Sequence, residues 1–434
     1  MSAERFARAR GVLVGGVSSP ARSFRAVGGT PRFASHGEGA WLIEPDGRRL
    51  LDFVGGWGAA IAGHAHPRVV ERVREAALGG LGFGVPTDIE VALAEEVRRR
   101  MPALERLRFT CSGTEAVMAA LRLARAATGR ELVVTFAGGY HGHADAVLGS
   151  GSPGVPRTTS RATLTARFND PDSVEALFRR HPNQIAAVLV EPVAANMGVV
   201  PPDSLATIRA GGNQVPPDSS DSSDSSFLAG LRSVTERHGA LLVFDEVVTG
   251  FRVARGGAQE RYGVTPDLTV LGKIVGGGLP CGALGGPAAL LERLAPAGPV
   301  FHAGTGAGNP LAMTAGLATL ELLDDAAYTR LEALGARLES GLRRALGRRA
   351  AVQRVGSMLT VFPGLDAVPD GEAAEQVDRE AFARLFHQLL EQGVHLPPSP
   401  HEAWFLGLGH GEEEIDFALG AVARTEIACP SFEA

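Results

Sequence analysis

Short apolar runs alternate with stretches of helical periodicity through the middle of the chain. Bounded by glycine, proline or polar residues, these runs predict short buried strands at residues 107–110, 131–136, 186–193, 241–247 and 268–272. Between them, residues 114–128 and 228–238 carry apolar side chains at the spacing of a helix. Alternation of strands and helices on this scale predicts an α/β fold, with a mainly parallel mixed sheet between helices.

The two ends of the chain have a different pattern. Residues 33–54 alternate apolar and polar positions around a Pro-Asp-Gly turn, which predicts a small hairpin. Towards the C-terminus the spacing predicts two amphipathic helices and one strand, at residues 326–348, 379–392 and 356–362. We therefore expect a small α+β domain formed by both termini beside a large central domain. The predicted boundaries are residues 1–60 and 321–434 for the small domain and residues 61–320 for the large one.

Composition narrows the class of protein. The 434 residues are 45% hydrophobic and 21% charged with a net charge of −6, so no basic excess indicates nucleic acid or an anionic membrane. Two uncharged stretches, residues 274–291 and 296–320, contain several glycines and prolines, which argues against membrane spans. No signal-peptide pattern is recognised near the N-terminus. Three widely spaced cysteines (Cys111, Cys281, Cys429) indicate free thiols, and we expect a cytoplasmic protein.

Residues 205–226 differ from the rest of the chain. The Val-Pro-Pro-Asp-Ser sequence at 200–204 recurs at 215–219 and is followed by a tract of serine and aspartate. Such a segment has no apolar surface to bury, so we predict a flexible surface insertion. A regulatory segment that accepts phosphate is the less favoured alternative.

Lys273 is the only lysine in the chain, since the other 41 of the 42 basic residues are arginines. It lies between a predicted strand and a glycine cluster, not in a polar surface segment. Arginine can replace lysine in an ion pair, but it cannot lose its proton and form an imine with a carbonyl group. A lysine left by chance is the alternative; the context favours a chemical role.

Three residues between a predicted strand and a predicted helix are candidates for a phosphate site. Ser112, Gly113 and Thr114 follow the strand at 107–110, where the N–H groups and the dipole of the helix attract an anion. An ordinary N-cap explains the same residues equally well.

Asp245 and the histidine pair follow other strands. Asp245 directly follows four apolar residues, and a partly desolvated carboxylate there requires a cation, which is a protonated nitrogen, a metal or one of the arginines. His141 and His143 lack the further ligands of a zinc site, so we expect no metal. Tyr140 at a strand end suits a position above a cofactor ring.

In combination, the lone lysine, the strand-end aspartate and the Ser-Gly-Thr segment resemble the fold type I enzymes of pyridoxal 5′-phosphate (PLP). The resemblance narrows to the class III aminotransferases and, among them, to the glutamate-1-semialdehyde 2,1-aminomutase family, over residues 11–425. The motifs that carry it are Gly-Val-Ser-Ser-Pro-Ala-Arg-Ser-Phe (16–24), Gly-His-Ala-His-Pro (63–67), Ser-Gly-Thr-Glu-Ala (112–116), Tyr-His-Gly-His-Ala-Asp (140–145), Glu-Pro-Val-Ala-Ala-Asn-Met-Gly-Val-Val-Pro-Pro (191–202), Phe-Asp-Glu-Val-Val-Thr-Gly-Phe-Arg (244–252), Gly-Gly-Ala-Gln (256–259), Gly-Lys-Ile-Val-Gly-Gly-Gly-Leu-Pro (272–280) and Pro-Pro-Ser-Pro-His-Glu-Ala (397–403).

The resemblance implies a role for each matching residue. Lys273 would bind PLP through an imine and move protons, and Asp245 would keep the pyridine nitrogen protonated. The other cofactor-binding residues implied are Ser112, Gly113, Thr114, Tyr140, His141, Asn196, Val247 and, reaching the partner's phosphate site in a homodimer, Thr305. The substrate-binding residues implied are Ser19, Arg22 and Trp57 for a carboxylate and Glu402 near the amino group.

The implied reaction is an internal transamination. The amine form of the cofactor, pyridoxamine 5′-phosphate (PMP), donates nitrogen to the aldehyde carbon of glutamate 1-semialdehyde, and a bound diamine then returns the other amine to give 5-aminolevulinate for tetrapyrrole synthesis. A gating loop retains the diamine in this family.

The chain departs from this pattern in two places. Residues 144–155, including Ser150, are shorter than the family's gating loop, and Phe301 replaces a tyrosine. The shorter loop favours one alternative, a related class III aminotransferase with an external amine donor. A second alternative is a non-catalytic paralogue with the same fold, but intact Lys273, Asp245 and Arg22 argue against it. A nucleotide-binding protein does not explain Lys273, and the chain has no Walker motif.

Overall fold

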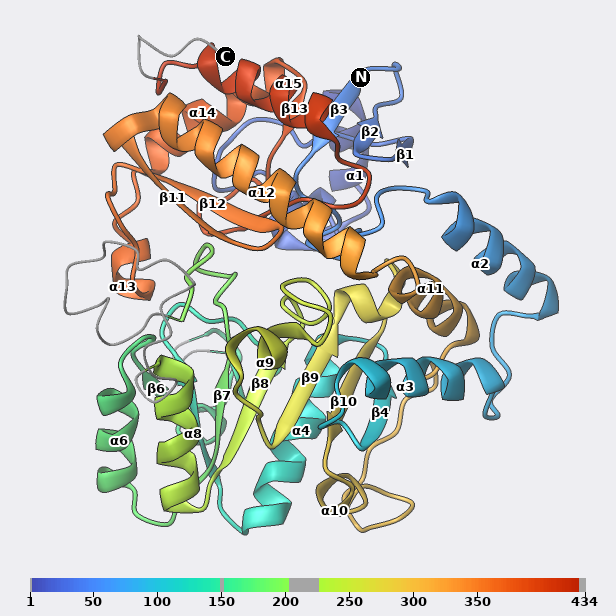
Figure 1. Ribbon diagram of the computed structural model, residues 1–434, viewed down its shortest axis with the longest axis vertical. Helices are drawn as coiled ribbons and strands as arrows, with labels where there is room; N and C mark the ends of the chain where they lie inside the picture. Colours follow the sequence, from blue (N-terminus) through green and yellow to red (C-terminus); the bar gives the residue numbers. More distant parts are fainter. Residues whose placement is uncertain (1, 149–151, 203–225, 429–434) are drawn as a thin grey trace.

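The computed structural model describes residues 2–148, 152–202 and 226–428 (Figure 1). Its largest element is a seven-stranded sheet in the order β4-β10-β9-β8-β7-β5-β6. The strands are β4 (Arg106–Thr110), β5 (Leu132–Phe136), β6 (Thr163–Ala166), β7 (Ile185–Val190), β8 (Leu241–Glu246), β9 (Leu268–Gly272) and β10 (Gly282–Gly286). β10 runs antiparallel to both β4 and β9, and the pairs from β9 to β6 are parallel. The predicted mainly parallel mixed sheet is therefore confirmed.

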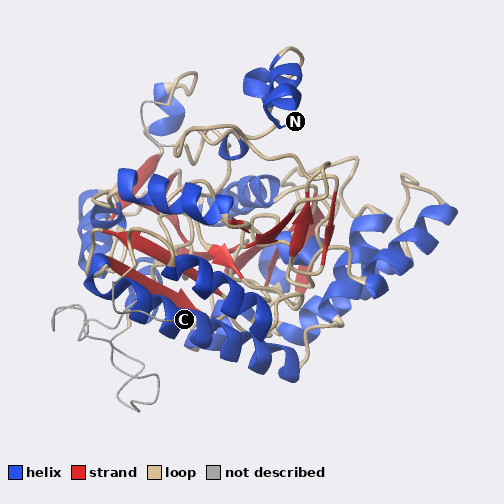
Figure 2. Cartoon of the chain, turned by 90° about the horizontal axis from the view of Figure 1, so that it is seen from above, coloured by secondary structure: helices blue, strands red, loops and turns tan. Residues whose placement is uncertain are grey.

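Helices cover both faces of this sheet, because neighbouring strand residues point to opposite sides. On one face, Val133, Leu189 and Val243 pack with apolar residues of α4 (Gly113–Thr128). On the other face, the adjacent residues of the same strands pack with α6 (Pro171–Arg180) and α8 (Phe227–His238). Seen from above, the strands lie enclosed between helices (Figure 2).

The terminal regions of the chain form two smaller sheets. One has the order β1-β2-β3-β13, and the other has the order β11-β12-β14. Their strands are β1 (His36–Glu38), β2 (Trp41–Ile43), β3 (Arg49–Asp52), β11 (Ala350–Val355), β12 (Met358–Pro363), β13 (Val394–His395) and β14 (Trp404–Phe405). The parallel pairing of β13 with β3 brings the N- and C-terminal regions together, and the helices of the C-terminal region lie on the same side of the molecule as β1, β2 and β3 (Figure 1). The domain boundaries at residues 60 and 320 stay a prediction.

The remaining helices surround these sheets. They are α1 (Ser2–Arg10), α2 (Pro67–Gly79), α3 (Asp88–Arg100), α5 (Arg157–Ser160), α9 (Gly257–Tyr262), α10 (Ala288–Leu291), α11 (Pro310–Leu320), α12 (Asp325–Leu346), α13 (Gly371–Ala374), α14 (Arg379–Glu391) and α15 (Glu412–Ala423), with short 3₁₀ turns η1 (Val14–Gly16), η2 (Pro20–Arg22), η4 (Lys273–Gly276) and η5 (Gly347–Arg349). Among the described residues, no helix is long and apolar enough to cross a membrane.

The structure corrects several predicted elements. The strand expected at 186–193 ends at Val190, and β6, β10, β11, β13 and β14 were not predicted. β10 escapes a pattern analysis because three of its five residues are glycines, which are poor strand formers. Gly282 is required by packing, since a Cβ there would lie 2.4 Å from the carbonyl oxygen of Ser112. The predicted insertion at 205–226, apart from its last residue, and Ser150 and Cys429 lie outside the described residues.

Candidate active site

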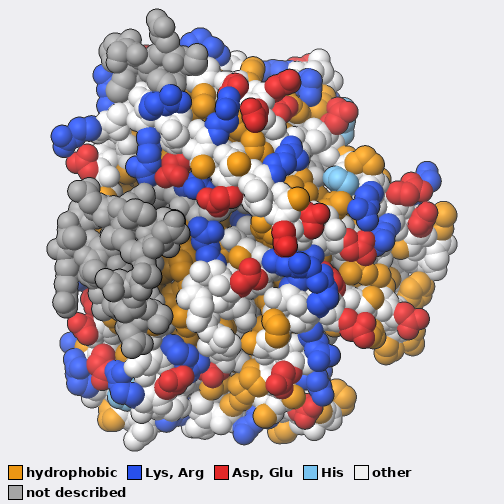
Figure 3. Space-filling model, viewed as in Figure 1, with side chains coloured by type: hydrophobic (Ala, Val, Ile, Leu, Met, Phe, Trp, Pro, Cys, Tyr) orange, Lys and Arg blue, Asp and Glu red, His pale blue; other side chains and the backbone are white. Residues whose placement is uncertain are grey.

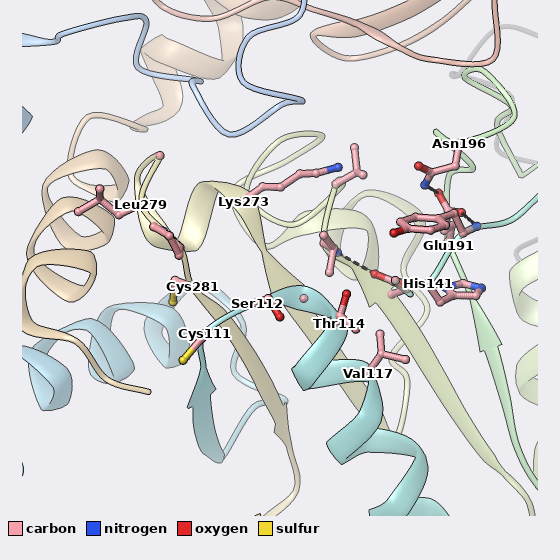
Figure 4. A pocket seen from close by; sticks show the side chains of 18 residues that line it. Cys111, Ser112, Thr114, Val117, His141, Glu191, Asn196, Lys273, Leu279 and Cys281 are labelled. Carbon is pink, nitrogen blue, oxygen red and sulfur yellow. Dashed lines mark hydrogen bonds and ion pairs between the residues drawn. The ribbon is translucent and has the colours of Figure 1, made fainter. Parts of the chain in front are cut away.

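The carboxyl ends of the parallel strands and the N-terminus of α4 enclose a cavity of about 410 Å³ (Figure 4). Such an edge is where open α/β sheets bind their ligands. Nine of the ten predicted cofactor residues line it, namely Ser112, Gly113, Thr114, Tyr140, His141, Asn196, Asp245, Val247 and Lys273. The structure therefore brings together residues that are up to 161 positions apart in the sequence (273 − 112).

Lys273 enters the cavity from the end of β9. Its φ of 49° places it in the left-handed region, a conformation that costs a residue with a side chain about 1–3 kcal/mol. Figure 4 shows the side chain extended into the cavity, with its nitrogen toward the side where Asn196 and Glu191 lie. Among the described residues, Nζ has no hydrogen bond or ion pair. Burial lowers the pKa of the amine, against the opposing charges of the nearby carboxylates.

Asp245 forms the other polar centre of the cavity. Its Oδ2 lies 2.7 Å from Nδ1 of His141, and its Oδ1 accepts a hydrogen bond from the N–H of Val247 at 3.1 Å. Burial alone would lower the pKa of His141, but the hydrogen bond and charge of Asp245 outweigh it, and the pKa is raised. Nε2 of His141 is buried without a partner among the described residues.

Glu191, directly after β7, organises the side of the cavity that carries Tyr140 and Asn196. Its Oε1 accepts from the N–H of Tyr140 at 2.9 Å, and its Oε2 accepts from the N–H of Ala195 at 3.0 Å and from Nδ2 of Asn196 at 2.8 Å. Because a carboxylate only accepts, this contact fixes which end of the Asn196 amide faces the cavity. Burial raises the pKa of Glu191. The sequence pattern assigned Glu191 no role, although it follows a buried strand just as Asp245 ends one.

The N-terminus of α4 presents free N–H groups to the cavity. Ser112 is the N-cap, since its Oγ accepts from the N–H of Glu115 at 3.2 Å, while the N–H groups of Gly113 and Thr114 have no partner among the described residues. A Cβ at Gly113 would lie 2.8 Å from Cγ2 of Val247, so only glycine allows this approach. The N-cap interpretation and the anion-site interpretation are therefore compatible.

This set of groups fits PLP. Free N–H groups at a helix N-terminus suit its phosphate, a carboxylate suits its pyridine nitrogen, and an unbonded amine of lowered pKa suits its aldehyde. Nε2 of His141 has no hydrogen-bond partner among the described residues, and the other ring nitrogen of this histidine contacts the carboxylate of Asp245. Each requirement of the cofactor thus has a matching group in one cavity.

The predicted substrate side is not part of this cavity. Ser19 and Trp57 are half-buried and Arg22 is exposed, and none of the three lines the cavity. Arg22 forms no ion pair with any described residue. Thr305 is exposed and also lies outside the cavity.

Among the predicted substrate residues, Glu402 interacts electrostatically with residues that line the cavity. Burial raises its pKa to about 7, and the charge of Lys273 opposes this rise. Its charge also raises the pKa of Tyr140, after the effect of burial. Cys111 and Cys281, for which the sequence indicated only free thiols, line the cavity as well.

Comparison with known sequences agrees with this site. The model of the family "Aminotransferase class-III" matches residues 24–210 and 221–403. Relatives named glutamate-1-semialdehyde 2,1-aminomutase include proteins of Thermomicrobium roseum (52% identical, covering 97% of this chain and 96% of the relative), Sorangium cellulosum (49%, 96% and 94%) and Roseiflexus castenholzii (48%, 96% and 95%).

Solved structures of similar fold include both transaminases and an aminomutase. An ω-transaminase from Sphaerobacter thermophilus is 35% identical with a TM-score of 0.85, over 97% of this chain and 96% of that one. A glutamate-1-semialdehyde aminomutase from Pseudomonas aeruginosa is 28% identical with a TM-score of 0.83, over 97% and 93%. A further form of that aminomutase is in complex with PMP. These likenesses confirm the predicted fold and the resemblance. The chain belongs to the class III aminotransferase family.

Proposed function

We propose that the protein converts (S)-4-amino-5-oxopentanoate, glutamate 1-semialdehyde, to 5-aminolevulinate by intramolecular amino transfer. The cofactor is PLP, with PMP as its amine form, and the product serves tetrapyrrole (porphyrin) biosynthesis. The proposal rests on the observation that Lys273, which is the only lysine, lines the same cavity as Asp245 and the N-terminus of α4. Identity of 48–52% over nearly the full chain to relatives named as this isomerase supports the choice of substrate.

The residues of the cofactor side each have a defined task. Bound PLP supplies an electron sink for the charge left on carbon when a proton leaves. Asp245, held by His141 and by the N–H of Val247, keeps a proton on the pyridine nitrogen. Lys273, with its lowered pKa, takes a proton from one carbon and gives it to another. Gly113 and Thr114 direct N–H groups to the phosphate.

The substrate side binds the carboxylate and contacts the amino group. We assign Arg22 to a bidentate contact with the substrate carboxylate, together with Ser19 and Trp57. Glu402, whose pKa is about 7, holds or releases a proton near the substrate amino group at neutral pH.

We infer a homodimer as the working form, with Thr305 of each protomer at the phosphate site of the other. Thr305 is exposed, so in this arrangement it is free to serve a second copy. Large apolar side chains are exposed on and between α2 and α3 and near Thr305, namely Val70, Leu78, Leu81, Phe83, Val85, Val91 and Phe301. Figure 3 shows hydrophobic side chains gathered along the edge formed by α2 and α3. Exposed apolar surface of this kind favours burial in an interface.

Two further assignments complete the proposal. A cytoplasmic location is supported by Cys111 and Cys281, which are free thiols. The division into a large domain of residues 61–320 and a small domain from both termini is supported by the separate small sheets of the terminal regions.

A turnover assay without any external amine donor or keto acid tests the function. The purified protein is supplied with glutamate 1-semialdehyde, and 5-aminolevulinate and 4,5-diaminovalerate are quantified over time. Sustained formation of 5-aminolevulinate with little free diamine is the expected result. Release of diamine with rapid loss of activity, or no reaction by a protein that holds its cofactor, contradicts the proposal.

A related transaminase with an external amine donor is the second candidate. The specific observation in its favour is that two solved transaminases are 35% and 33% identical to this chain, whereas a solved aminomutase is 28% identical. The segment at 144–155, which is shorter than the family's gating loop, also favours this candidate, because a diamine that escapes must be replaced by an external amine. Addition of an amino acid and a keto acid to the assay distinguishes the two candidates: a large gain in rate identifies the transaminase.

A further inference from the structure

Arg252 is a cation buried beside the active site without a carboxylate partner. Its side chain is only 2% exposed, and it forms no ion pair with any described residue. Burial lowers its pKa to about 9, which still leaves the group charged at neutral pH. An unpaired buried charge is costly, so it persists only where other contacts compensate. The sequence pattern assigned no function to this residue, although it ends the motif at 244–252.

The guanidinium bonds three oxygens from three separate segments of the chain. One nitrogen donates to Oγ of Ser357 and to the carbonyl of Leu406, both at 3.0 Å, and another donates to the carbonyl of Gly58 at 2.6 Å. The guanidinium carbon also lies 4.8 Å from the centre of the Phe405 ring. Arg252 thus connects the turn after β8 to the N-terminal region and to two C-terminal residues, Ser357 directly before β12 and Leu406 directly after β14.

One of these segments is a strained loop that carries Trp57. Four consecutive residues, 55–58, all have positive φ values, and Trp57 at 61° is the one that is not glycine. A left-handed conformation at a residue with a side chain persists only when its surroundings hold it. Asp52 holds the start of the loop by accepting from the N–H groups of Val54 and Gly55, and Arg252 holds its end at Gly58.

The loop end packs on an apolar cluster that also contains residues next to Glu191. Phe405, on which Gly58 and Arg252 both pack, follows Glu402 by three positions and belongs to one apolar cluster with Val193 and Ala195 of the Glu191 segment. A segment of the N-terminal region passes above Lys273 in Figure 4. The charged groups that act on Lys273 are the carboxylates Glu402, Glu191 and Asp245 and, with the opposite effect, Arg252.

We propose that Arg252 is a positioning residue, which fixes the conformation of the Trp57 loop through its hydrogen bond to Gly58. The proposal rests on the proposed function, in which Trp57 belongs to the substrate side.

The test compares Arg252→Lys with Arg252→Gln. Lysine keeps the charge but not the planar fork that reaches three oxygens, and glutamine removes the charge. Both variants should raise the KM for glutamate 1-semialdehyde about 10-fold or more with a smaller change in kcat, because substrate-side contacts are displaced. Cofactor absorbance should be retained in both.

The KM comparison also separates this proposal from the proposed function. A wild type that does not turn over glutamate 1-semialdehyde refutes the proposed function, whereas an active wild type with an unchanged KM in the folded variants refutes only the role of Arg252.

Two further variants separate positioning from folding. Arg100 is similarly buried (6% exposed) and donates to the carbonyls of Leu320 and Leu323, but it lies outside the cavity and pairs with Glu96. Arg100→Lys should lower the melting temperature and leave KM unchanged. If the Arg252 variants do not fold, Ser357→Ala removes one hydrogen bond alone, and KM should rise about 2–10-fold. An unchanged KM in folded Arg252→Lys or in Ser357→Ala overturns the proposal.

Discussion

The two sides of the proposed site are built in different ways. The cofactor side consists of residues at strand ends and at a helix N-terminus, and a single chain assembles it in one cavity. The proposed substrate side includes Glu402 and, in turns and loops near the N-terminus and outside that cavity, Ser19, Arg22 and Trp57. Strand ends of a parallel sheet converge because of topology alone, whereas irregular segments need specific anchors such as Arg252. The comparison teaches that cofactor binding and substrate binding can be damaged separately.

The largest effect is expected at Lys273, on which the cofactor side depends. Lys273→Ala should reduce turnover by at least about 10²–10⁴-fold, because it removes the proton-transfer group as well as the covalent link to the cofactor. The absorbance spectrum of the bound cofactor should change in parallel. Lys273→Arg is the matched variant: it keeps the charge, cannot lose its proton, and should be equally inactive. Appreciable turnover in either variant contradicts the mechanism.

Asp245→Asn should weaken the cofactor side without unfolding it. In the proposed site Asp245 pairs with the protonated pyridine nitrogen, so loss of its charge should raise the PLP concentration needed for reconstitution about 100-fold. Glu246→Gln provides the control, since Glu246 is equally buried but faces the N-terminus of α9, where it accepts from the N–H of Ala258 at 2.7 Å. Glu246→Gln should lower stability and spare PLP affinity. Equal loss of PLP affinity in both variants would refute the distinction.

Arg22→Lys tests the substrate side alone. Loss of a bidentate contact should raise KM about 10-fold and leave kcat and PLP binding unchanged. Arg25, three residues further and also exposed, is the matched position: Arg25→Lys should have no effect. An unchanged KM in Arg22→Lys places Arg22 outside the substrate pocket.

The smallest effect is expected at Glu402, and it concerns the pH dependence of stability. Its pKa of about 7 in the folded protein exceeds the ordinary value of 4.5, so the folded state binds this proton more tightly than the unfolded state does. The resulting stabilisation is complete at low pH and is lost as pH rises through 7. Relative to Glu402→Gln, the cofactor-free wild type should lose of the order of 1 kcal/mol in unfolding free energy between pH 5 and 8, measured with urea. Parallel pH curves for the two proteins would show that Glu402 is not buried in this way.

The central sheet and the cofactor side are predictable because their signals are local. Each apolar run ends in a polar or small residue, so the sequence alone places Asp245 and Lys273 at the sheet edge. Glu191 directly follows the apolar run of β7 and carries the same signal, but the sequence analysis assigned it no role.

The rest depends on contacts that no local pattern records. β10 is glycine-rich because its neighbours leave no room for a Cβ, and that requirement exists only in the folded sheet. The bonds from Arg252 to Gly58 and Leu406 span 194 and 154 positions, and both acceptors are backbone carbonyls, which every residue has. The placement of Trp57 therefore could not be predicted from residue type or spacing.

Because Lys273 is the only lysine, proteolysis at this residue can report local opening of the active site. A lysine-specific protease has one peptide bond to cut in this chain, the bond between Lys273 and Ile274 at the start of η4, where Ile274 and Val275 are buried. Proteolysis requires several residues of extended, accessible backbone, so cleavage occurs only when this part of the fold opens. The rate of that one cut measures how often the active site comes apart, without any label or added tryptophan.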